Sequence, residues 1–171
     1  NVNGDWELIE ATVDSGACAT VSGKETASAF PIRDPDKAKN FKAANKSVIK
    51  NHGRRDIWGV SGDGVKINFA TNVADVDGML IALNAIVDSG NQVTFRKESS
   101  GGSYITNEIN GKATQMRRVG GSWKYRIWVP TPQEINSSRA KKVEETFYMR
   151  DPSPRITQNP NKHLVIALGP H

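Results

Sequence analysis

One cysteine, Cys18, is present among 171 residues, which excludes a disulfide within the chain. The three histidines lie far apart and no Cys/His spacing indicates zinc, so we expect neither a metal site nor another cofactor. No apolar run approaches the length of a membrane span, and no RNP, zinc-knuckle or helix-turn-helix pattern indicates a nucleic-acid site. The scarcity of cysteine fits a reducing compartment, which favours an intracellular location, or an organelle after removal of a targeting segment.

Proline is scarce before residue 130 and concentrated after it, since six of the eight prolines lie in residues 130–171. We therefore divide the chain into a domain over residues 1–129 and a Pro-rich C-terminal extension over residues 130–171. The extension is expected to wrap the domain or to dock on a partner. A hydrophobic content of 37% predicts one domain with a modest core.

The net charge of +5 is scattered along the chain. Such a balance favours weak contact with polyanions or acidic partners, and a solvated basic surface explains it better than a dedicated nucleic-acid site does. The pairs Arg54-Arg55 and Arg117-Arg118 are expected to be exposed.

Short alternating runs separated by turn residues predict an all-β domain with one helix. Residues 78–87 place Leu80, Leu83 and Val87 on one face at helical spacing and predict that helix. Residues 41–50 are expected to pair with residues 54–60, or to turn earlier at Asn45-Lys46. The remaining strands are expected at residues 6–13, 18–21, 65–70, 92–96, 104–109, 111–119 and 123–129. In the extension, residues 143–149 and 163–168 are expected to form short elements.

The most informative motif is Asp14-Ser15-Gly16-Ala17, which follows an apolar strand. A strand that ends in Asp-Ser-Gly presents a carboxylate on a tight turn, where Gly16 allows close backbone approach and the Ser15 hydroxyl can brace the turn or a neighbouring chain. An ordinary turn is the alternative, since Asp and Gly are common in turns.

A second Asp-Ser-Gly begins at Asp88, 74 residues after the first. Its preceding residues indicate a helix rather than a strand. We therefore expect Asp88 to lie at a helix end beside the capping glycine Gly90.

The order of these elements resembles a retropepsin-like aspartic protease, the single-lobed kind found in retroviral and retrotransposon polyproteins, and the copia-type form in particular. Residues 13–17 match its active-site turn, and residues 41–46 resemble the segment leading into its flap hairpin. Residues 78–86 and 90–95 resemble its apolar helix and the strand that follows. The family usually has Gly beside the flap Asn, where this chain has Lys46, and a Gly-Arg-Asp or Gly-Arg-Asn step entering the helix, where this chain has residues 80–83.

The resemblance implies a closed β-barrel that forms a homodimer and hydrolyses peptide bonds in a peptide or polyprotein substrate. The catalytic residues would be Asp14, Ser15 and Gly16, with Asp14 meeting its copy across a twofold axis. The substrate would contact the residues of the turn and of the flap, namely Ala17, Ala43, Ala44, Asn45 and Lys46.

The alternative is a domesticated, non-catalytic subunit that keeps the protease fold. It would bind or scaffold a larger protein assembly through residues 130–171. An active dimer places two Asp14 carboxylates together, whereas a subunit leaves a single Asp14 unpaired or capped by its own chain.

Overall fold

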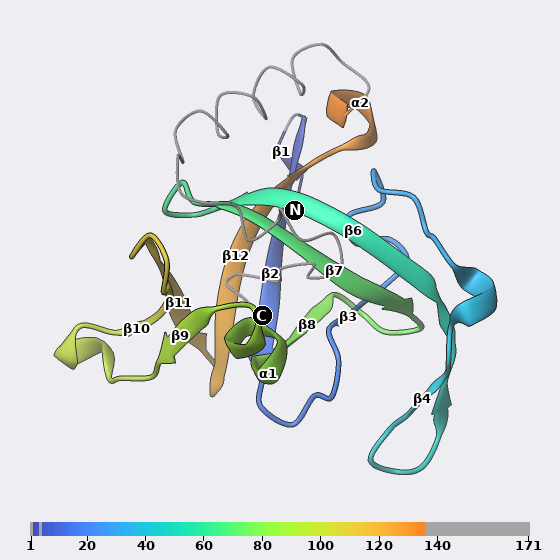
Figure 1. The fold of residues 1–171 in the computed structure, drawn as a ribbon, viewed down its shortest axis with the longest axis horizontal. Coiled ribbons are helices and arrows are strands. Elements are labelled where there is room, and N and C mark those ends of the chain that lie inside the picture. Colours follow the sequence, from blue (N-terminus) through green and yellow to red (C-terminus); the bar gives the residue numbers. More distant parts are fainter. Residues whose placement is uncertain (1, 4, 136–171) are drawn as a thin grey trace.

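The computed structural model describes residues 2–3 and 5–135, and these form a mainly β structure with two short α-helices (Figure 1). The all-β class is therefore confirmed. The elements predicted at residues 143–149 and 163–168 lie outside the described residues.

Strand β2 (Trp6–Asp14) is the central element, because all of it except Asp14 pairs with β12 (Ser122–Pro130). The two strands are antiparallel, with Trp6 opposite Pro130 and Val13 opposite Trp123. Alternate side chains of β2 are buried, as the period of a half-buried strand requires.

The other edge of β2 pairs in parallel with β8 (Met79–Ala82), which lies between β2 and β3 (Val21–Ser22). Strand β3 pairs in parallel with β7 (Lys66–Ala74) on its other edge, and β7 pairs antiparallel with β6 (Asn51–Ser61). Strand β6 then pairs with β12. The hydrogen bonding thus runs in a ring through β2, β8, β3, β7, β6 and β12.

The remaining strands extend this sheet at its two ends. Strand β1 (Val2–Asn3) pairs with β2, and β11 (Ala113–Val119), β10 (Ser103–Asn107) and β9 (Asn91–Thr94) follow β12 in that order. A separate hairpin joins β4 (Phe41–Lys42) to β5 (Val48–Ile49). The helices are α1 (Leu83–Asp88) and α2 (Pro132–Ile135), with 3-10 turns at Pro35–Lys37 and Glu98–Ser100.

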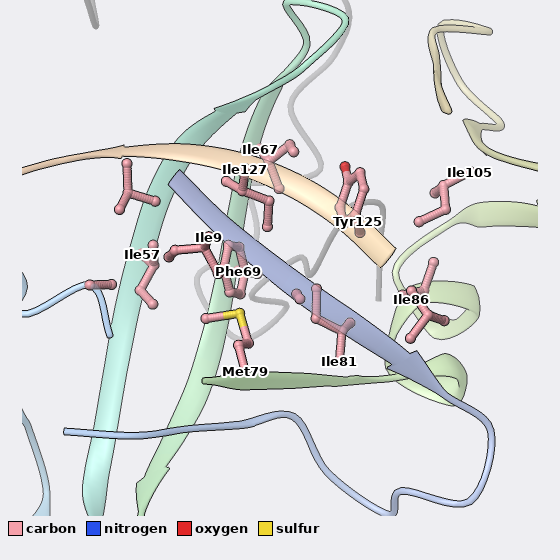
Figure 2. Packing of buried hydrophobic residues seen from close by; sticks show 14 of the residues in the cluster. Ile9, Ile57, Ile67, Phe69, Met79, Ile81, Ile86, Ile105, Tyr125 and Ile127 are labelled. Carbon is pink, nitrogen blue, oxygen red and sulfur yellow. The ribbon is translucent and has the colours of Figure 1, made fainter. Parts of the chain in front are cut away.

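Apolar side chains from the ring strands meet between them and form the core (Figure 2). Ile9, Phe69 and Ile81 come from three different strands of the ring, and Ile86 brings α1 onto the same cluster. Tyr125 is fully buried, and this burial raises the pKa of its phenol well above 10.0. The phenol therefore stays neutral within the core.

Two predicted elements differ from the structure, and a third takes one of its two expected forms. Residues 79–82 form β8 rather than the first turn of a helix, because the strand bonds of β2 and β3 on both sides outweigh the helical spacing of the apolar residues. Residues 41–50 close on themselves through the Asn45-Lys46 turn, which is one of the two expected arrangements, and β6 pairs with β7 rather than with this segment. The strand predicted at residues 18–21 is reduced to the two residues of β3. Helix α2 is additional, since the only helix expected in the domain was the one at residues 78–87.

Candidate functional site

Asp14 is the last residue of β2 and lies opposite Ala82 of the parallel strand β8. Its Oδ1 accepts a hydrogen bond of 2.7 Å from the backbone N–H of Gly16. This bond closes a local turn of the kind that Asp side chains favour. Ser15 and Gly16 are exposed, while Asp14 and Ala17 are half-buried, so the turn presents a carboxylate at the surface.

The glycine of this turn is not required by its own chain. A Cβ on Gly16 would meet Oδ1 of Asp14 at 3.4 Å, which is an ordinary contact, and its φ lies outside the left-handed region. The close backbone approach predicted for Gly16 is therefore not found within this chain.

The chain after the turn is fixed by Thr20, which is buried between β8 and β7. Its hydroxyl accepts a hydrogen bond of 3.2 Å from the backbone N–H of Ala82, the residue opposite Asp14. Its carbonyl accepts bonds of 3.0 Å and 3.2 Å from the backbone and side-chain nitrogens of Asn72. Thr20 therefore ties the segment that carries the carboxylate to both neighbouring strands.

The residues predicted to contact substrate in the flap, Ala43, Ala44, Asn45 and Lys46, lie together in the turn of the β4–β5 hairpin. The Asn45 Oδ1 accepts bonds from the backbone N–H of Ser47 at 3.0 Å and from its hydroxyl at 2.6 Å. Lys46 has a φ of 69°, in the left-handed region that favours glycine. The structure thus brings these four residues together and gives Lys46 a backbone conformation unusual for its type.

The base of this hairpin is held by Asn51, which is only 8% exposed. Its backbone N–H donates to Oδ1 of Asn40 at 3.0 Å, and its side-chain amide donates to the carbonyl of Lys39 at 3.1 Å. The same amide lies 3.4 Å from Oδ1 of Asn72. Because Asn72 also bonds to Thr20, hydrogen bonds connect the base of the hairpin to the segment after Asp14.

A polar pair lies beside Asn51. His52 is the extra residue of an irregularity in the β6–β7 pairing, and its Nε2 is 2.7 Å from Oδ1 of Asp75. The hydrogen bond to His52 lowers the pKa of the Asp75 carboxyl, and Lys24, 3.9 Å away, contributes in the same direction. This pair joins the start of β6 to the residue that follows β7.

Arg55 was expected to be exposed and is instead 5% exposed. Its Nε donates to the carbonyl of Phe30 at 2.8 Å, and its Nη1 donates to the carbonyls of Lys24 at 2.9 Å and Thr26 at 2.8 Å. Desolvation by burial lowers the pKa of its guanidinium. The strand alternation of β6, which places odd-numbered residues inside, is the signal that would have predicted this burial.

The second Asp-Ser-Gly lies at the end of α1, as predicted. Asp88 is the last residue of the helix and is exposed, and Gly90 follows with a φ of 86°. The Ser89 hydroxyl donates to the carbonyl of Ala85 at 2.7 Å and closes the helix end. This motif therefore has a local structural explanation.

Within residues 2–3 and 5–135, no group of three or more His, Cys, Asp or Glu side chains is arranged to hold a metal ion. In the same part of the chain, no helix combines the length and apolar character needed to cross a membrane. Comparison of the chain with protein-family models, with curated proteins and with solved structures gives no significant match.

Proposed function

We propose that this chain is an aspartic endopeptidase of the retropepsin-like kind that works as a homodimer. The observation that carries the proposal is the position of Asp14, on an exposed turn at the end of a central strand that is flanked in parallel by β8. The ring of paired strands behind it is proposed to be the barrel of that family.

One carboxylate is insufficient for this chemistry, so a second copy must supply the other. A twofold axis beside the turn would place Asp14 against its counterpart, since an isologous interface uses the same patch twice. Two features support this arrangement. The turn is accessible, and Gly16 leaves room for an approaching backbone although nothing in its own chain requires glycine there.

The two carboxylates would share one proton, because like charges so close cannot both ionise. The ionised partner removes a proton from a water molecule held between them. The protonated partner donates a hydrogen bond to the carbonyl oxygen of the scissile peptide and stabilises the developing oxyanion. The pair titrates as a unit, so neither Asp14 has a separate pKa in the active dimer.

The β4–β5 hairpin would act as the flap over an extended peptide substrate. Ala17 beside the carboxylate, and Ala43, Ala44, Asn45 and Lys46 in the hairpin turn, would contact the substrate backbone. The hydrogen bonds from Asn51 through Asn72 to Thr20 support this role, because they fix the base of the hairpin relative to the segment that carries Asp14.

The chain itself offers a matched control for testing this proposal. Cleavage of an unstructured polypeptide at mildly acidic pH, with and without pepstatin, is measured for the wild type, Asp14→Asn and Asp88→Asn. Both variants change the aspartate of an Asp-Ser-Gly, and only Asp14→Asn should abolish cleavage. Sedimentation should show a dimer. A strict monomer without cleavage, or equal activity of wild type and Asp14→Asn, would contradict the proposal.

A non-catalytic, protein-binding subunit is the second candidate, and one observation favours it. Asp14 is capped by its own chain, through the 2.7 Å bond from Gly16 to Oδ1. A carboxylate that serves only to close this turn needs no second copy. Under this reading, Asp14→Asn should lower stability without any effect on peptide cleavage, because none occurs.

A further inference from the structure

The β4–β5 hairpin and the residues leading into and out of it form a strongly basic segment. Residues 37–50 contain five lysines and no aspartate or glutamate, although the net charge of the whole chain is only +5. We call this segment the lysine hairpin; its cations are Lys37, Lys39, Lys42, Lys46 and Lys50. Positive charge is thus concentrated on the element proposed to close over the substrate.

These lysines are exposed, and most lack a neighbouring carboxylate. Lys37 lies 3.8 Å from Asp34, whereas Lys39, Lys42 and Lys46 have no carboxylate within 4.0 Å in the described part of the chain. Figure 1 shows the hairpin, which carries the label β4, projecting from the large sheet at the lower right of the view. Unpaired cations on a projecting element are available to an anionic partner.

The tip of the hairpin carries a charge where the backbone favours a residue without a side chain. Lys46 has a φ of 69°, and glycine adopts that conformation without steric cost. No hydrogen bond of the described chain uses the Lys46 ammonium group, since the turn is closed by backbone groups and by Asn45. Within the described residues, local folding therefore gives no reason for lysine at this position.

We propose that the lysine hairpin recognises an acidic peptide segment, so that the preferred substrate carries Asp or Glu residues in the stretch beneath the hairpin. This inference rests on the proposed endopeptidase function and names the substrate class of the same site. Hydrogen bonds through Asn51, Asn72 and Thr20 connect the hairpin base to the Asp14 segment, and under the proposed function the hairpin lies over a peptide bound at Asp14.

A peptide fits this surface better than a nucleic acid does. Single-stranded nucleic acids bind where cations alternate with exposed aromatic rings on which bases stack. The only aromatic residue of the lysine hairpin is Phe41, which is half-buried. The segment also contains no arginine, whose planar fork suits phosphate groups.

Binding is tested separately from cleavage by using full-length protein that carries Asp14→Asn. Fluorescence anisotropy measures the affinity of a labelled peptide rich in Asp and Glu, of the same peptide with Asn and Gln in their place, and of a single-stranded RNA of equal charge. The hairpin variant is Lys39→Gln/Lys42→Gln/Lys46→Gln. The control Lys97→Gln/Arg117→Gln/Arg118→Gln removes three exposed cations elsewhere.

The acidic peptide should bind more tightly than its neutral counterpart. The hairpin variant should bind the acidic peptide about five- to tenfold more weakly at low ionic strength, because it loses three exposed ion contacts. The control should bind as the unchanged protein does, and added salt should reduce the difference. Equal loss in both variants, equal affinity for the two peptides, or tighter binding of the RNA would overturn the inference.

If the wild type cleaves neutral and acidic peptides equally well, the substrate class is wrong while the endopeptidase function stands. If acidic peptides bind through the hairpin but are not cleaved by the wild type, recognition stands and the endopeptidase function fails.

Discussion

Replacing Arg55 by methionine removes a buried cation while keeping a side chain of similar length. The guanidinium donates three hydrogen bonds of 2.8–2.9 Å to the carbonyls of Phe30, Lys24 and Thr26. These carbonyls belong to the loop that follows β3 and covers β6. Methionine would leave them without their donor, and the loop would have to open to water.

The expected loss of stability can be estimated from these contacts. A hydrogen bond to a charged group contributes about 1.5–3 kcal/mol net, and three bonds from one side chain do not add fully. The desolvation that lowers the pKa of Arg55 offsets part of the gain. We therefore expect a loss of about 3–5 kcal/mol, since each of three carbonyls left without a donor costs roughly 1–3 kcal/mol and these costs are partly offset. This is a large part of the roughly 5–15 kcal/mol that stabilises a typical domain.

The neighbouring residue provides the control. The Arg54 guanidinium lies 2.7 Å from Asp56, and the two side chains are 38% and 35% exposed. Arg54→Met should therefore cost less than about 1 kcal/mol. Urea unfolding gives the free energies, and hydrogen exchange should show faster exchange of residues 23–30 in Arg55→Met only. Equal losses of unfolding free energy in the two variants would refute the conclusion that the hydrogen bonds of buried Arg55 hold this loop in place.

Three further predictions concern the hairpin and the sheet. The folded-state pKa of Asp75 lies below its ordinary value of 3.8, so its stabilising effect is present above that pH and disappears as the pH falls through the folded pKa. Thermal melts across pH should show a stability gap between wild type and Asp75→Asn that closes in acid, whereas a gap constant with pH would count against the His52 contact. Lys46→Gly should raise stability by about 1 kcal/mol in urea unfolding by relieving the left-handed backbone, and no gain would argue against that conformation. Gly59→Ala should cost about 1–3 kcal/mol, because its Cβ would lie 2.6 Å from a carbonyl oxygen of β12, while Gly62→Ala, with open space around it, should leave the thermal midpoint nearly unchanged.

Local patterns in the sequence were sufficient to predict the elements whose partners are close in the chain. The segments expected to be strands at residues 54–60 and 65–70 lie in β6 and β7, which pair with each other as neighbours in the chain. The turn that carries Asp14 follows its strand as predicted, and the hairpin turn at Asn45-Lys46 was one of two expected positions. In these two turns an Asp or Asn side chain accepts a hydrogen bond from the backbone N–H two residues later, which is a local interaction that the residue type predicts.

The rest depends on contacts between distant segments, which no local pattern contains. The apolar run at residues 79–82 suits a helix or a strand equally, and only its position between β2 and β3 makes it β8. The alternation of β6 places Arg55 on the inner face, but arginine is normally exposed, and only the carbonyls of a distant loop provide the partners that its burial needs. The sequence assigns no hydrogen-bonding role to Asn51 or Asn72, since an asparagine gives no sign of its hydrogen-bond partner until the strands are paired.

The pairing of β2 with β12 also has a consequence for biosynthesis. One edge of β2 finds its ladder partner only in β12, with Trp6 opposite Pro130, so this edge stays unpaired while nearly the whole described chain is translated. Contacts between residues so distant in sequence make folding slow, and an unpaired apolar strand invites association with other nascent chains. Chaperone capture of Trp6–Asp14 during synthesis would protect the very segment that ends in the carboxylate.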